Sequence, residues 1–215
     1  MTIDPNNGVV TALSKVVDVI ETTILTIICS IPIVTIGASV SAMHRTMMDI
    51  IMDRCSSVHR TFFSAFKEDF SLSGKIFIAA VLSGALILVD AIISFGYTGT
   101  NHTMAGISKG VTISLSILHF VYFSFCFASS ARFKVTAKQA FQNAFLYCLG
   151  KTGWALLIAL IAVVEGFSIY ILSFYCIPVI CLCLYIENRI LLVAMLGKNA
   201  LREQKKNNEG EIYYG

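Results

Sequence analysis

Uninterrupted apolar stretches of about twenty residues recur along this chain, and they constrain its fold more than any other feature. The longest apolar block runs from Trp154 to Leu196. Charged residues make up 13% of the 215 residues, whereas a typical soluble domain carries about 25%. A helix needs about 20 apolar residues to cross about 30 Å of hydrocarbon. The chain is therefore predicted to be an all-α integral membrane protein.

Five segments are long and apolar enough to cross the bilayer, and they define a single membrane domain over residues 1–200. The predicted spans are 16–36, 75–96, 108–130, 153–173 and 176–196. Pro178 lacks the amide that a continuous helix needs, so we expect a tight turn between residues 173 and 178. A kinked or re-entrant segment is the alternative. Residues 201–215 are polar and are expected to form a flexible cytoplasmic tail.

Lysine and arginine residues alternate with the predicted spans. Five of them fall between His44 and Lys75, whereas residues 97–107 contain none. Four more occur from Arg132 to Lys151, and four occur after Leu196. The positive-inside rule then makes both long connections and the C-terminus cytoplasmic. We expect a protein of the cell membrane with its N-terminus outside and its C-terminus inside.

The two cytoplasmic connections show helical periodicity. In SVSAMHRTMMDIIMDR, residues 39–54, apolar side chains recur at helical spacing with charged residues on other faces. HRTFFSAFKEDF (59–70) and AKQAFQNAFLYCLGK (137–151) show the same character. These segments are predicted to be amphipathic interfacial helices on the cytoplasmic membrane surface.

An internal repeat is indicated by the match between residue i and residue i+79. Phe62 matches Phe141, Ala65 matches Ala144, and Gly74 matches Gly153 without a gap. The predicted repeating unit is a span, a cytoplasmic amphipathic helix and a second span. Both copies begin outside, so the repeats are parallel and not inverted.

Seven acidic, basic or histidine side chains stand out within the predicted spans: Asp18, Glu21, Asp90, His119, Glu165, Glu187 and Arg189. Such residues cost a few kcal/mol in a span and therefore tend to face protein or water. Asp90 is close enough to the outer end of its span to be solvated. Glu165 is the expected partner of Arg189, as an ion pair that locks the last two spans together. A polar path, a substrate pocket or a proton relay is the alternative.

Sequence motifs for catalysis are not found. The chain contains no Gly-rich phosphate loop, no His-Glu-x-x-His and no nucleophile elbow. Five of the seven cysteines lie inside apolar runs, where cysteine packs as a small hydrophobic residue. We expect neither enzymatic activity nor a metal or other cofactor.

Two sequence blocks carry a family resemblance. The first is IPIVTIGASVSAM, with Pro32, Thr35 and Gly37, and the second is FFSAFKEDF. The motif residues of the second block are Phe62, Phe63, Phe66, Lys67, Asp69 and Phe70. Together the blocks resemble the YesL-like family of bacterial multi-pass membrane proteins, a domain of unknown function. Ala38 departs from the second proline that is usual in that family.

The first block is expected to form the inner end of the first span. Pro32 weakens the last helical turns, Thr35 hydrogen-bonds a carbonyl that this break frees, and Gly37 permits a close turn.

The family resemblance implies a protein that is encoded beside carbohydrate uptake systems and glycan-degrading enzymes and has no established biochemical activity. We therefore expect a non-enzymatic accessory membrane protein associated with oligosaccharide uptake. Its phenylalanine-rich amphipathic helices would dock a subunit of a carbohydrate ABC transporter or a second copy of the chain. The lipid bilayer is the remaining expected partner, and no nucleic acid is expected. The alternative is a small oligomeric transporter or channel that uses the buried Glu, His and Arg residues.

Overall fold

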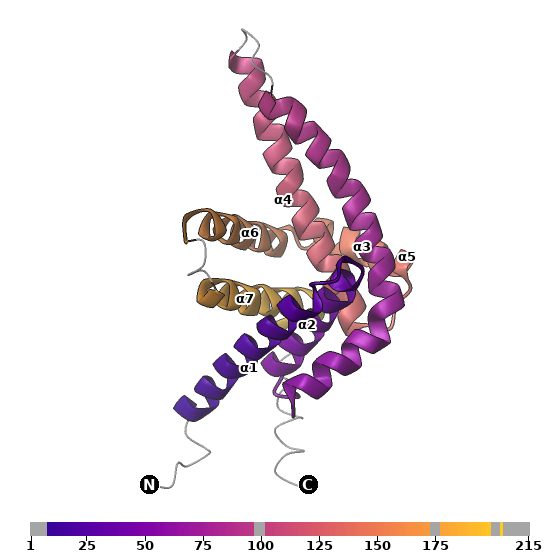
Figure 1. Cartoon of the computed structure of the whole chain (residues 1–215), viewed down its shortest axis with the longest axis vertical. Helices are drawn as coiled ribbons and strands as arrows, with labels where there is room; N and C mark the ends of the chain where they lie inside the picture. Colours follow the sequence, from indigo (N-terminus) through magenta and orange to yellow (C-terminus); the bar gives the residue numbers. More distant parts are fainter. Residues whose placement is uncertain (1–7, 97–101, 173–176, 199–202, 204–215) are drawn as a thin grey trace.

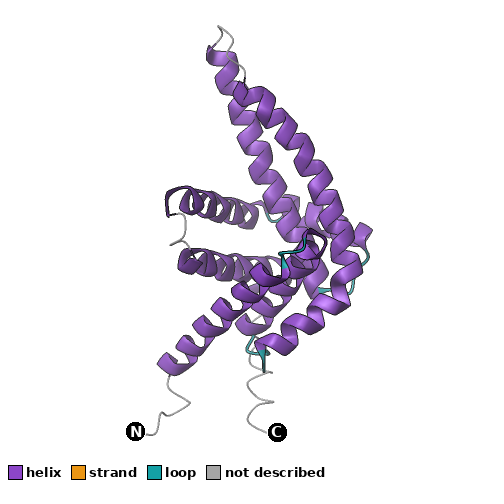
Figure 2. Ribbon diagram, in the orientation of Figure 1, coloured by secondary structure: helices purple, strands orange, loops and turns teal. Residues whose placement is uncertain are grey.

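The computed structural model describes residues 8–96, 102–172, 177–198 and 203, and these residues form an all-helical fold (Figures 1 and 2). The α-helices are α1 (Gly8–Cys29), α2 (Ile36–Ile51), α3 (Val58–Gly96), α4 (His102–Arg132), α5 (Ala137–Gly150), α6 (Thr152–Leu172) and α7 (Ile177–Leu196), with a short 3-10 helix, η1 (Ile33–Thr35). The predicted tail, 201–215, falls outside the described residues except for Glu203, and so does most of the predicted turn near residue 173.

Three of the described helices are long and apolar enough to cross a membrane, namely α3, α4 and α7. Helices α5 and α6 qualify only as a pair, and they are bent by 99° at a short break. The structure therefore supports membrane insertion with three or four candidate spans and does not confirm five. Helix α1, which contains most of the predicted first span, carries Lys15, Asp18 and Glu21 within its 22 residues.

The helices form two hairpins that extend in different directions from a shared centre (Figure 1). Helices α3 and α4 run side by side to the top of the view, and α6 and α7 project to one side of it. Helix α2 lies where these hairpins and α1 meet, and it contacts α1, α3, α4 and α7. The centre of the fold is therefore built around one short helix.

Helix α2 is buried and does not lie on a membrane surface. Twelve of its sixteen residues are buried, including Met43, Met47 and Met48. Its other faces carry the small residues Ala38 and Ala42, which let neighbouring helices approach. The predicted interfacial location of residues 39–54 is therefore wrong, because protein covers the methionine side chains that were assigned to lipid.

The corner before α2 is built by the first motif block. Helix α1 ends at Cys29, and the Thr35 hydroxyl lies 2.6 Å from the Cys29 carbonyl oxygen and 2.7 Å from that of Pro32. Thr35 therefore hydrogen-bonds a freed carbonyl, as predicted. Gly37 has a different role from the one predicted, because it lies inside α2 against α3. A Cβ atom at Gly37 would be 2.6 Å from the Ser73 carbonyl oxygen.

Polar side chains join α3 to α4 along their hairpin. A hydrogen bond of 3.0 Å connects Ser83 Oγ and His119 Nε2. Nearer the end of the hairpin, the Thr112 hydroxyl donates to Asp90 Oδ2 at 2.6 Å, and Ser108 donates to Ser94 at 2.7 Å. Asp90 and His119 therefore each form a hydrogen bond that joins α3 to α4, and Asp90 is not simply solvated.

A buried hydrogen bond also connects α2 to α7. The Nδ1 atom of His44 lies 2.7 Å from Oδ1 of Asn188, and both side chains are almost fully buried. We expect His44→Leu and Asn188→Leu each to destabilise the protein by about 1–3 kcal/mol, because each leaves a buried polar partner unsatisfied. The double variant should lose less than the sum of the two single changes, as measured by thermal unfolding in mild detergent. Strictly additive losses would contradict this pairing.

The two copies of the predicted repeat adopt different shapes. Helix α3 continues without interruption through Gly74, whereas the matching segment is broken at Lys151 between α5 and α6. The Lys151 amine donates a hydrogen bond to the Ala194 carbonyl oxygen near the end of α7. This contact favours the bend, because a cation is stabilised near a helix C-terminus. The repeat itself stays a prediction.

Candidate functional site

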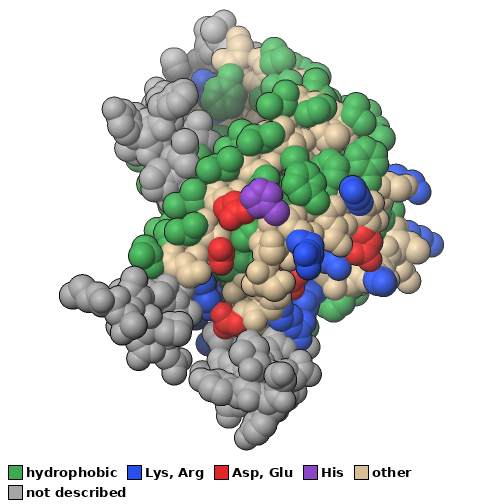
Figure 3. Space-filling model, turned by 60° about the horizontal axis from the view of Figure 1, so that its bottom comes forward, with side chains coloured by type: hydrophobic (Ala, Val, Ile, Leu, Met, Phe, Trp, Pro, Cys, Tyr) green, Lys and Arg blue, Asp and Glu red, His purple; other side chains and the backbone are tan. Residues whose placement is uncertain are grey.

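A charged pocket of about 440 Å³ opens between α2, the first half of α3 and the loop after α4. Seven charged side chains line it: Arg45, Asp49, Arg54, Glu68, Asp69, Arg132 and Lys134. Met48, Leu72 and Phe133 add apolar surface. Figure 3 shows acidic and basic side chains gathered on one part of the surface, beside a broad hydrophobic area. The pocket combines four cations and three carboxylates from three segments of the chain.

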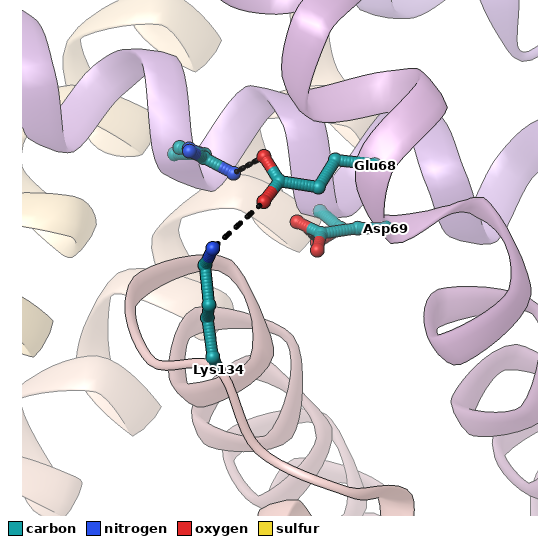
Figure 4. Close-up of polar contacts among 5 residues, drawn as sticks. Glu68, Asp69 and Lys134 are labelled. Atoms are coloured by element: carbon teal, nitrogen blue, oxygen red, sulfur yellow. Dashed lines mark hydrogen bonds and ion pairs between the residues drawn. The ribbon is translucent and has the colours of Figure 1, made fainter.

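Glu68 connects two of these segments. Its Oε2 atom accepts a hydrogen bond of 2.8 Å from Arg45 Nη1, and its Oε1 atom lies 3.7 Å from Lys134 Nζ (Figure 4). Arg45 belongs to α2, whereas Lys134 belongs to the loop between α4 and α5. Arg45 lowers the pKa of the Glu68 carboxyl by hydrogen bonding and by its charge. Glu68 is therefore a partly exposed carboxylate that links α2 to the α4–α5 loop at the edge of the pocket.

The two aspartates lie deeper than Glu68. Asp69 Oδ2 accepts a hydrogen bond of 3.4 Å from the Ser41 hydroxyl, and Asp49 Oδ1 lies 4.0 Å from Arg132 Nη1. Burial raises the pKa of both aspartate carboxyls, and neighbouring arginines oppose that shift. A positively charged group that entered the pocket would stabilise both carboxylates.

Charged side chains supply most of the polar groups that line the pocket. Ser130 supplies its one hydroxyl group, which donates to the Phe127 carbonyl oxygen at 2.8 Å. Within the part of the chain that the structure describes, no group of three His, Cys, Asp or Glu side chains could hold a metal ion. The remaining polar groups are fixed charges, which recognise charges of opposite sign.

The structure does not form the expected pair between Glu165 and Arg189. Arg189 is exposed, and no ion pair among the described residues includes it. Glu165 interacts electrostatically with Glu187 instead, and one oxygen of each carboxyl group is buried without a hydrogen-bond partner. The Ser124 hydroxyl of α4 hydrogen-bonds Glu187. Two acidic side chains therefore share the interior between α6 and α7.

The phenylalanines of the predicted docking helices, here called the aromatic stripe, are partly buried within the protein. Phe62 is fully buried, and its ring stacks on Phe66 with centroids 6.4 Å apart. Phe141 packs between Tyr122 and Phe123 of α4. The exposed members are Phe63, Phe70 and Phe145. Phe62, Phe66 and Phe141 therefore pack within the fold, while the other three phenylalanines are exposed.

The sequence predicts the side of the membrane from the lysines and arginines of the pocket, but it does not predict that they form a pocket with acidic residues. Among the predicted motif residues, Asp69 lines the pocket, whereas the neighbouring Lys67 does not. One signal was present: the acidic pair Glu68 and Asp69 in the first connection complements Arg132 and Lys134 in the second. Periodicity within each segment does not show such a long-range match.

Residues 20–91 match a family model described as "Protein of unknown function, DUF624". The matched region extends from the second half of α1 through α2 and most of α3. It contains both sequence blocks on which the YesL-like resemblance rests, and it contributes five of the seven charged pocket residues. No curated protein and no solved structure matches the chain.

Proposed function

We propose that this chain is a non-enzymatic accessory membrane protein that docks a partner subunit at its charged pocket. The observation that carries the proposal is the convergence of seven charged side chains from three segments: α2 with the loop after it, α3, and the end of α4 with the loop after it. Arg54 and Lys134 are exposed at its surface, so they are accessible to a partner. A mixed set of charges favours a protein segment that presents both signs.

The proposed partner is a transporter subunit that approaches from the side on which the pocket opens. The positive-inside rule assigns this side to the cytoplasm, because both connections that form the pocket are rich in lysine and arginine. The association with oligosaccharide uptake rests on the family resemblance alone. Docking at the pocket replaces docking through the aromatic stripe, whose central side chains are already packed within the fold.

The alternative of a small oligomeric transporter has less geometric support. His119 lies on α4 and is hydrogen-bonded to Ser83 of α3, while Arg189 is exposed on α7. His119 and Arg189, which were expected to form a polar transport path with Glu165, therefore do not lie in contact with it among the described contacts.

Charge reversal at the pocket should abolish docking. We expect the double variant Arg54→Glu and Lys134→Glu to lose co-purification with a carbohydrate transporter subunit in mild detergent, and to lower oligosaccharide uptake in cells. The two introduced glutamates would then repel the partner's acidic groups, and like charges at an interface cost several kcal/mol.

The matched control is Lys138→Glu, which reverses an exposed lysine outside the pocket lining. Equal loss of binding with the control and with the double variant would count against the pocket as the docking site. Unchanged uptake with the double variant would also count against the proposal, provided that expression and thermal stability match the wild type.

A further inference from the structure

Helix α1 has an inverted distribution of polar and apolar side chains. Thr22 and Thr23 are buried, and Lys15, Asp18 and Glu21 are only partly exposed. The apolar side chains on the opposite face are between 39% and 64% exposed: Leu13, Val16, Val17, Ile20, Ile24, Ile27 and Ile28. A helix on a water-exposed surface shows the reverse arrangement. Something apolar must therefore cover the outer face of α1.

Two ion pairs show which part of α1 lies beside the turn between α2 and α3. Lys15 Nζ lies 2.5 Å from Asp53 Oδ1, and Glu21 pairs with His59 at the start of α3. The first half of α1 therefore lies beside the turn between α2 and α3. This turn belongs to a connection predicted to be cytoplasmic, whereas the same part of α1 was predicted to be outside. The two predictions cannot both be correct.

The turn between α1 and α2 is apolar and highly exposed. Ile31, Ile33 and Val34 are 74–77% exposed. Local bonds satisfy much of the backbone there: Ser30 N–H donates to the Thr26 carbonyl oxygen at 2.9 Å, and Thr35 N–H donates to that of Pro32 at 3.0 Å. An irregular turn in hydrocarbon requires such internal satisfaction, whereas a turn in water would not need apolar side chains.

The length of α1 limits how deep the turn at residues 30–35 can lie in the bilayer. From Lys15 to Cys29 the helix rises about 21 Å at 1.5 Å per residue. The hydrocarbon core is about 30 Å thick. With Lys15 near one surface, the turn at residues 30–35 lies within the core and does not reach the opposite surface.

We propose that α1, the turn at residues 30–35 and α2 form a re-entrant hairpin that enters the bilayer from the side of the α2–α3 turn. Lipid acyl chains cover the outer face of α1 and the apolar turn. The polar face of α1 is turned inward, where Thr23 accepts a hydrogen bond from the Cys181 thiol of α7. The N-terminus then lies on the same side as residues 52–57. This proposal does not depend on the docking function.

The depth of the turn can be measured by tryptophan fluorescence, because Trp154 is the one tryptophan in the chain. Val34→Trp is placed in a Trp154→Phe background and reconstituted in vesicles of phosphatidylcholine that carries bromine at mid-chain. We expect several-fold stronger quenching than for the matched variant Ser57→Trp, which lies in the α2–α3 turn. A blue-shifted Val34→Trp signal that bromine does not quench would show that protein covers the turn, and would overturn the proposal.

The side of the N-terminus is a separate measurement. A protease-cleavable tag before Met1 is compared with Ser57→Cys labelled by a membrane-impermeant maleimide, above the wild-type background. In oriented vesicles we expect the tag to be cleaved only from the side on which Ser57→Cys reacts. Cleavage from the opposite side would establish that α1 crosses the membrane and would overturn the re-entrant hairpin.

Discussion

Replacing Gly37 with alanine should destabilise the fold by about 1–3 kcal/mol, the range typical of overpacked cores. The added Cβ atom would lie 2.6 Å from the Ser73 carbonyl oxygen and 2.7 Å from Phe77 Cβ. Neither contact can be relieved by rotation of a flexible side chain, because one atom belongs to the backbone and the other is a Cβ atom. Helices α2 and α3 would have to separate, and α2 is central to the fold. Thermal unfolding in mild detergent measures the loss.

Gly74→Ala is the matched control, because it makes the same change in α3. Apart from the adjacent residues and the nearby backbone of α3 itself, no atom of the described residues lies within 4 Å of a Cβ atom at Gly74. This variant should be neutral or more stable by about 0.5–1 kcal/mol, since alanine has less conformational freedom to lose in a helix than glycine. Equal destabilisation at both positions would show that steric contact with α3 does not explain the requirement for Gly37.

Replacing Glu187 with glutamine should stabilise the protein by about 1–3 kcal/mol, because it removes a buried acidic group that forms no ion pair among the described residues. The Glu187 side chain is only 2% exposed, and its Oε1 atom lacks a hydrogen-bond partner. Glutamine keeps nearly the same volume and adds donor groups beside Glu165. The expected observation is a higher midpoint of thermal unfolding in mild detergent.

Glu165→Gln and Arg189→Met distinguish this explanation from an ion pair between α6 and α7. Glu165→Gln should also stabilise, and the two glutamine substitutions together should give less than the sum, because each relieves the same repulsion. Arg189→Met should have little effect, since Arg189 is exposed. A large loss of stability in Arg189→Met would restore the ion-pair interpretation.

Part of the set of candidate membrane spans could be predicted from sequence, because helix length and hydrophobicity are read directly from it. The predicted spans at 75–96 and 108–130 lie within α3 and α4. The location of α2 could not be predicted in the same way, since a stripe of methionines fits both lipid and a protein interior. Burial of α2 depends on small residues that face α3, and a single sequence does not show which helix approaches them.

The candidate site was harder to predict from the sequence than the fold was. Glu68 and Lys134 are 66 positions apart, and only the antiparallel arrangement of α3 and α4 brings them together. Similarly, the periodicity of α7 correctly separates Glu187 from Arg189 but does not show which of them faces Glu165. Long-range pairing of charges is a property of the packed helices and leaves little trace in local patterns.

The polar contacts within the α3–α4 hairpin bear on how the chain enters the bilayer. Asp90 and His119 find their partners, Thr112 and Ser83, within the same hairpin. During biosynthesis these two helices can therefore leave the translocation machinery together with their polar groups already paired. Insertion as a preformed pair avoids the cost of placing each polar group in lipid alone. We expect the α3–α4 hairpin to insert before the α6–α7 hairpin packs against it.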